Sequence, residues 1–288
     1  MKAYQFCIIF MIFSVTMMLL REESINEELQ VKNLLTDNKT LFDKAVDAAV
    51  DRLRAYNEND WEYAADEAVS SFYDSLYASL DIMDSPDGRE SLKLYIPAII
   101  ISDNEGYYVY FTEDVSENDF KELKIRRSEK QYYIYSESNA PEGKRATDFI
   151  MRFTGKESCI VSDFAGVLGS KMQVFDYGGN ENSELTELLL KNNYYSILTD
   201  LESFELKRRE LMAGMIENSL KYYCNVHNSM AHQNGVEYEF NIPDYDGELF
   251  LQAADGVAFW AFFQGYPIKG SDKFYNCFTV SNARVVEK

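Results

Sequence analysis

The residues best suited to bind a metal lie within one short segment and are Cys224, His227 and His232. Thiolate and imidazole groups are the usual ligands of zinc, and a structural zinc site uses four ligands. The surrounding pattern predicts a helix, in which residues five apart are rotated by roughly 140° from each other. The two imidazoles therefore point to different sides, and we expect neither a metal site nor another cofactor.

Other catalytic signatures are missing from the sequence. The stretch 166–171 lacks the spacing of a phosphate-binding loop, and there is no Gly-x-Ser-x-Gly nucleophile motif. Cys159 or Cys224 with His227 would supply a thiol and a base, but without the flanking residues of a thiol protease a buried cysteine is the simpler interpretation. The 48 acidic residues always include carboxylate pairs, so such a pair does not indicate a glycoside hydrolase. We expect a protein that is not an enzyme.

The balance of charge excludes another class of function. The chain of 288 residues has 48 acidic and 28 basic residues, which gives a net charge of −20. Such a charge repels the phosphates of nucleic acids, so we expect no nucleic-acid partner. With 46% hydrophobic and 15% aromatic residues, the chain has enough apolar side chains for a packed core.

The first residues predict a retained membrane anchor. No charge occurs from Tyr4 to Leu20, and apolar residues dominate on all sides of the expected helix, including Ile8, Phe10 and Phe13. A core helix would show a polar stripe, and a cleaved signal peptide would end in small residues. Lys2 precedes the run, so the positive-inside tendency places the N-terminus in the cytoplasm and the body outside.

Three cysteines lie beyond this run, with no paired Cys-x-x-Cys motif. One disulfide, between Cys224 and Cys277, is one interpretation, and three free thiols are the alternative.

Hydrophobic periodicity predicts helices first and then mostly strands. The first two helices have apolar faces formed by Phe42, Ala45, Val46, Ala49, Val50 and Leu53, and by Trp61, Ala65, Ala68, Phe72, Leu76 and Leu80. Strands follow at 94–101, 107–112, 131–136, 148–153, 158–163, 236–242, 257–266 and 274–282. A long helix that begins at about residue 203 interrupts them, and its apolar stripe comprises Phe204, Leu211, Met215, Ser219, Tyr222 and Tyr223. We expect the strand at 94–101 to be buried on both faces, and Pro97 to mark it as an edge strand or a bulge.

This order predicts an α+β fold with an N-terminal transmembrane helix and helical stalk, then a mainly antiparallel sheet packed with one long helix. The expected domains are a transmembrane anchor at 1–22, a helical stalk or helix pair at 23–90 and an extracytoplasmic α+β domain at 91–288.

Aromatic residues crowd the predicted strands. Because side chains alternate across a strand, some rings of each set should face outward and offer contact area to a protein or a sugar, although plain cross-strand pairing on a solvated face is the favoured interpretation. The predicted interaction surface comprises Tyr107, Tyr108, Tyr110, Tyr132, Tyr133 and Trp260.

The basic start, apolar helix, amphipathic continuation and sheet resemble pilin-like proteins, including the minor pseudopilins of tight-adherence pilus systems. This resemblance covers about the first fifty residues, and it implies cleavage before the apolar helix and a glutamate at the fifth mature position. Cleavage after Ala3 would place Ile8 there instead. On this basis we expect a non-enzymatic assembly component of a cell-envelope system, whose partners are the membrane and other envelope proteins or itself.

A second resemblance favours a different class. The helices leading into YIPAIIISDNEGYYVYF (95–111) are similar to the start of Cache-type extracytoplasmic domains, in which a hairpin with an acidic-glycine turn forms part of a ligand pocket. The alternative function is therefore a ligand-sensing or binding domain, with a small molecule or glycan as its ligand. An envelope hydrolase is the third alternative.

Overall fold

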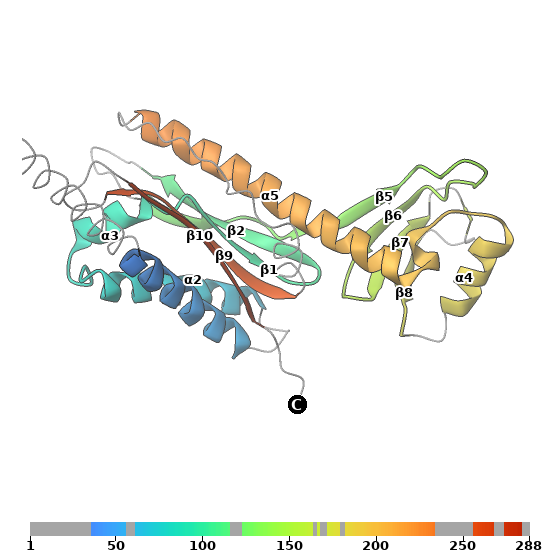
Figure 1. Ribbon diagram of the computed structural model, residues 1–288, viewed down its shortest axis with the longest axis horizontal. Coiled ribbons are helices and arrows are strands. Elements are labelled where there is room, and N and C mark those ends of the chain that lie inside the picture. The colour runs from blue at the N-terminus through green and yellow to red at the C-terminus, as the bar shows by residue number, and fades with distance from the viewer. Residues whose placement is uncertain are drawn as a thin grey trace, which may run out of the picture.

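The computed structural model describes residues 36–55, 61–115, 123–163, 166–167, 172–178, 182–233, 256–267 and 274–283. These residues form two antiparallel sheets joined by one long helix, α5 (Leu201–Gln233), which runs from the smaller sheet across the larger one (Figure 1).

The larger sheet has the strand order β10-β9-β1-β2-β3, with β4 pairing with β2. Its strands are β1 (Ala98–Ser102), β2 (Gly106–Asp114), β3 (Leu123–Arg127), β4 (Gln131–Tyr132), β9 (Val257–Pro267) and β10 (Phe274–Ala283). The strands predicted at 94–101 and 107–112 are present as β1 and β2 and form an antiparallel hairpin, and every residue of β1 is buried as expected. The edge prediction from Pro97 is wrong, because Pro97 precedes β1 and β1 lies between β9 and β2.

Helices cover both faces of the larger sheet (Figure 1). On one face pack the helical residues 36–54 and α2 (Trp61–Ser79), which share a core with Ile99, Ile101 and Phe259. On the other face α5 packs against Ile100 and Trp260. The predicted apolar faces of the first two helices are buried, apart from the half-buried Trp61 and Leu80, so residues within the predicted 23–90 segment belong to the same core as the sheet.

A short third helix, α3 (Pro86–Lys93), follows α2. In α3 the side chain of Ser85 accepts a hydrogen bond from the amide of Gly88, and Pro86 occupies the first turn. A serine cap followed by proline is a common start of a helix, because proline has no N–H group to leave unpaired there.

The smaller sheet has the order β5-β6-β7-β8, with β5 (Ile134–Glu137), β6 (Phe149–Phe153), β7 (Ser158–Asp163) and β8 (Met172–Asp176). Its inner residues, such as Phe149, Met151 and Val161, pack with α5, with α4 (Asn182–Lys191) and with the short helix η2 (Ile197–Thr199). The single strand predicted at 131–136 is divided at Tyr133, because β4 belongs to the larger sheet and β5 to the smaller one.

The predicted fold class requires correction. It included a transmembrane helix, but no helix among the described residues is both long enough and apolar enough to cross a membrane. It also included one sheet, whereas the described chain is α+β with two antiparallel sheets. The predicted anchor at 1–22, with Tyr4, Ile8, Phe10, Phe13 and Leu20, and the predicted strand at 236–242 lie outside the described residues.

The predicted disulfide between Cys224 and Cys277 is not formed, because both are free thiols. Cys277 packs against the core on the α2 side of the larger sheet. Cys224 lies four residues after Leu220 on α5, which packs on the opposite face. A sheet therefore separates the two sulfurs, and no small rearrangement would bring them within bonding distance.

We expect Cys159, Cys224 and Cys277 all to react with an alkylating reagent when the protein is denatured without reduction, as mass spectrometry would show. In the folded protein the half-buried Cys277 should react first, because burial raises the pKa of the Cys159 and Cys224 thiols to about 12. Labelling of Cys224 and Cys277 only after reduction would contradict the free-thiol assignment.

Candidate functional site

The residues that suggested metal or thiol chemistry are part of the hydrophobic core. Cys224 and His227 are both buried on α5, and burial raises the pKa of the Cys224 thiol to about 12 and lowers the pKa of His227 to about 4. The side chain of His232 lies outside the described residues. Within the described ranges, no group of three histidine, cysteine or acidic side chains is placed to hold a metal ion.

Burial of His227 predicts a pH dependence of stability. The pKa of His227 is about 4 in the folded protein against an ordinary value of 6.5, so the unfolded chain takes up the proton first as the pH falls. This effect leaves the free energy of unfolding unchanged above about pH 6.5 and lowers it as the pH falls from about 6.5 to 4. At pH 5 the free energy of unfolding is lower by about 2 kcal/mol.

Denaturant unfolding at pH 8 and pH 5 would measure this loss. His227→Leu should lose about 2 kcal/mol less than the natural protein between the two pH values, because a leucine takes up no proton. Equal losses in both proteins would show that His227 does not carry the effect.

The predicted aromatic interaction surface is mostly buried. Tyr107, Tyr108, Tyr110, Tyr133 and Trp260 all lie in the core, and only Tyr132, 40% exposed, reaches solvent. The six residues therefore do not form one exposed surface. The physical reason is that helices cover both faces of the larger sheet, so both alternating sets of rings point into a core.

Two of these tyrosines connect the sheet to α2. The Tyr110 hydroxyl donates to Asp66 at 2.7 Å, and the Tyr108 hydroxyl donates to Glu62 at 3.4 Å. Arg127 pairs with Asp66 at 3.0 Å and lies over the Tyr108 ring, so a single cation joins both contacts. These polar groups have structural partners.

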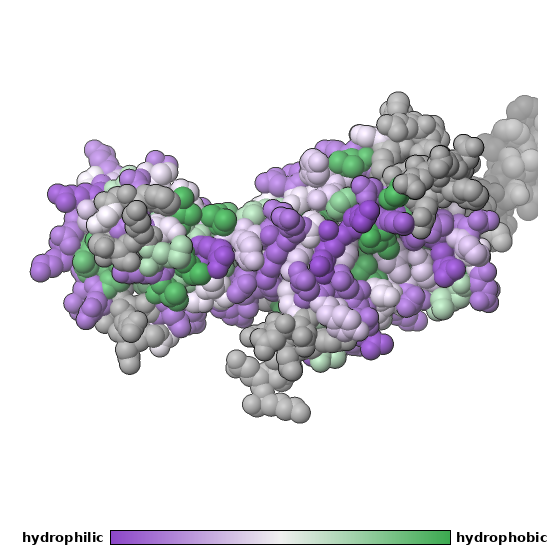
Figure 2. Space-filling view, turned by 180° about the vertical axis from the view of Figure 1, so that it is seen from behind, coloured by the Kyte–Doolittle hydropathy of each residue, from purple (hydrophilic) through white to green (hydrophobic). Residues whose placement is uncertain are grey.

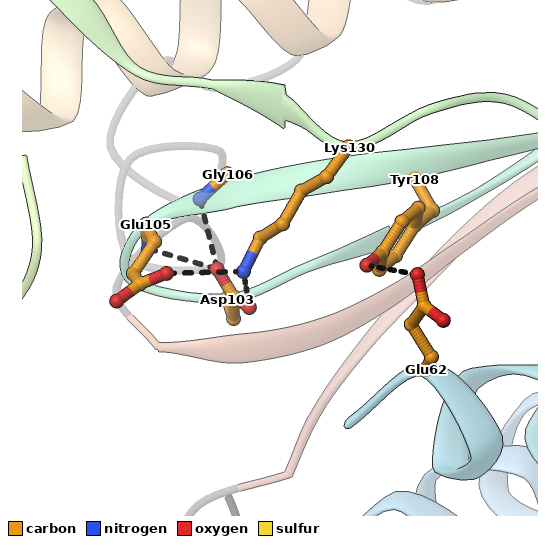
Figure 3. Close-up of polar contacts among 6 residues, drawn as sticks. All are labelled: Glu62, Asp103, Glu105, Gly106, Tyr108 and Lys130. Carbon is orange, nitrogen blue, oxygen red and sulfur yellow. Dashed lines mark hydrogen bonds and ion pairs between the residues drawn. The ribbon is translucent and has the colours of Figure 1, made fainter. Parts of the chain in front are cut away.

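The acidic-glycine turn between β1 and β2 is held by its own residues (Figure 3). Asp103 Oδ1 accepts from the amides of Glu105 and Gly106, both at 2.8 Å. Asp103 Oδ2 accepts from Lys130 Nζ at 2.7 Å, and Lys130 also pairs with Glu105 at 3.3 Å. The turn carboxylate is therefore occupied by contacts within the protein.

Glycine is required at position 106 because β4 passes close to the backbone there. A Cβ atom on Gly106 would lie 2.3 Å from the carbonyl oxygen of Gln131, too close for any other residue without a shift of the strand. The resulting register places Tyr107 opposite Gln131. The turn and the Lys130 ion pair together fix where these two residues lie.

Asp103→Ala should lower the free energy of unfolding by about 2–3 kcal/mol, because two part-buried amides and a half-buried ammonium lose their acceptor. Asp103→Asn should cost about 1 kcal/mol, since it keeps an oxygen for the amides and loses only the ion pair. Denaturant unfolding of both variants measures the difference. Equal losses would show that the turn bonds do not depend on this side chain as described.

The smaller sheet presents an apolar surface to solvent. The outward side chains of Ile134, Ile150, Met172 and Val174 are between 36% and 74% exposed, and Ile160, half-buried, lies between Arg152 and Val174 in the strand register. We name these five residues the outer face. Figure 2 shows hydrophobic surface on this smaller lobe beside polar residues.

An antiparallel sheet with one solvated face normally alternates apolar-in and polar-out. Here β6 and β8 carry apolar residues on both sides: Ile150 stands between the buried Phe149 and Met151, and Val174 precedes the buried Phe175. The largest apolar patch on the surface of a monomer is often a functional contact surface. The sequence signal is that both alternating sets of positions in these short strands carry apolar residues. The prediction of a strand at 148–153 did not use this signal.

Two charged residues lie on the same side of the smaller sheet as the outer face. Arg152 is exposed on β6 and lies 4.9 Å from the centre of the Tyr132 ring, so the one exposed member of the predicted aromatic set lies beside this face. Asp176 is exposed at the end of β8 and is aligned with Ser158. Arg152 therefore lies within the outer face, between Ile134 and Ile160 in the strand register, and Asp176 lies at its edge, two residues beyond Val174.

The chain matches no protein-family model, and comparisons with curated proteins and with solved structures give no match either.

Proposed function

We propose that this protein is a non-enzymatic structural component that assembles with further copies of itself through the outer face of the smaller sheet. The observation that carries the proposal is the set of four exposed apolar side chains on one sheet face. Removing apolar surface from water is favourable by roughly 25 cal/mol per Å², so such a face lowers its free energy when another surface covers it.

The distribution of charge along the chain favours a second copy of the protein as the partner that covers the outer face. The chain carries −20 overall, but residues 134–191 contain nine acidic and six basic residues, so this lobe is only weakly acidic. Two copies that meet at this lobe therefore each bring a net charge of only −3 from residues 134–191 to the contact. In a two-fold arrangement each copy contributes the same patch, so Arg152 of one copy could face Asp176 of the other.

The size of the outer face sets the strength of the contact. Four strands spaced about 4.8 Å apart, with about 3.3 Å per residue, give a face of roughly 300 Å². A stable interface buries roughly 800 Å² on each partner. One such contact is therefore weak, and a lasting assembly needs several contacts acting together.

The wider setting stays a prediction from the sequence. The resemblance to pilin-like proteins, the cell-envelope role and the extracytoplasmic location of the body rest on residues outside the described ranges. The self-association proposal does not depend on them.

The double variant Met172→Lys and Val174→Lys tests the proposal in the full chain. Both side chains are exposed on the edge strand β8, so the fold should tolerate lysine, while two added cations on each copy would repel across the contact. Sedimentation velocity should show that the natural protein associates as its concentration rises and that the variant associates far less.

Met83→Lys provides the matched control, because it places lysine at an exposed apolar residue between α2 and α3, away from the outer face. This control should associate like the natural protein. A natural protein that stays monomeric at all concentrations, or association that persists in the double variant, would overturn the proposal.

A further inference from the structure

A second surface feature lies on the other lobe, where α5 crosses β2 and β4. A groove of about 390 Å³ opens there, with Tyr107, Val109 and Met215 among the residues along its base. Its volume is at the lower end of the roughly 300–1,000 Å³ range of small-molecule sites, so it suits a ligand of one or two rings.

The groove exists because the α5 stripe contains one small residue. Met215, Ser219 and Tyr223 follow each other at intervals of four along the helix and face the sheet. Ser219 leaves a space that a larger side chain would fill, and its hydroxyl lies 2.7 Å from the Tyr107 hydroxyl. The Tyr107 hydroxyl also donates to the carbonyl oxygen of Met215 at 3.3 Å, which fixes the ring at the base.

The walls are aromatic rings and the rim carries amides. The Tyr223 ring packs on Phe111 with centres 4.8 Å apart, and the Tyr222 ring meets Tyr223 edge-on at 5.1 Å. The exposed side chains of Gln131 and Asn218 lie at the groove, from β4 and α5 respectively.

The site is electrically neutral. None of the eight described residues that line the groove is charged. Burial raises the pKa of the Tyr107 and Tyr223 hydroxyls, so both stay protonated and uncharged at neutral pH. A strongly acidic chain also repels anionic ligands from a neutral groove.

We propose that this groove binds a neutral sugar of one or two rings. Tyrosine rings present flat apolar surfaces on which the C–H face of a sugar ring packs, and carboxamide side chains donate to and accept from its hydroxyl groups. The groove has this combination of rings, amides and hydroxyls, with no charged group among its described lining residues. This binding is independent of self-association, because the groove and the outer face lie on different lobes.

Tyr222→Ala tests the proposal with maltose, cellobiose and N,N′-diacetylchitobiose as probes, using saturation-transfer NMR and a titration of the full-length protein. At least one disaccharide should bind the natural protein in the millimolar range. The variant should bind it roughly five- to tenfold more weakly, because it loses one stacking ring. Tyr222 is 62% exposed, so the fold should not depend on it.

Tyr63→Ala is the matched control, since Tyr63 is 58% exposed but lies on α2, on the opposite side of the larger sheet from the groove. It should bind the sugar as the natural protein does. No saturation transfer from any of the three disaccharides at about 10 mM, or equal binding in Tyr222→Ala and the natural protein, would overturn the proposal.

Discussion

Burial of the larger sheet on both faces is the constraint on which the rest of the structure depends. Every residue of β1 is buried, and the Trp260 indole donates to Ser102 at 2.9 Å inside the core, so the central strands have no solvated side. One face takes α2 and the other takes α5. Because α5 is longer than the sheet that it covers, its first half packs on the smaller sheet and leaves that sheet one helix-covered face and one solvated face (Figure 1).

Much of the fold could be predicted from periodicity. The hairpin, the apolar faces of the first helices and the long final helix follow from repeats of 2 and 3.6 residues. The division of strand 131–136 at Tyr133 could not be predicted, because a change of sheet leaves the alternation intact. The prediction that Tyr108 and Tyr110 belong to an exposed surface was wrong for a related reason. Alternation indicates which rings share a face of the sheet, but not whether a helix distant in sequence covers that face.

The candidate site was less predictable than the fold. Cys224 and His227 were candidates for a metal or thiol site because of their residue types, yet both are buried on the packing face of α5. The outer face was missed because Ile150 and Val174 look like ordinary strand residues until their exposure is known. A groove formed around Ser219 depends on two elements meeting at one point, which a pattern along a single chain does not contain.

The central claim is that the outer face of the smaller sheet becomes covered when copies meet. Hydrogen exchange measured at low and high protein concentration tests it directly, because amides at a contact exchange more slowly as the contact fills. The account predicts slower exchange at high concentration in β6, β7 and β8, with no change in α2. Unchanged exchange in these strands, or slowing confined to other elements, would contradict it.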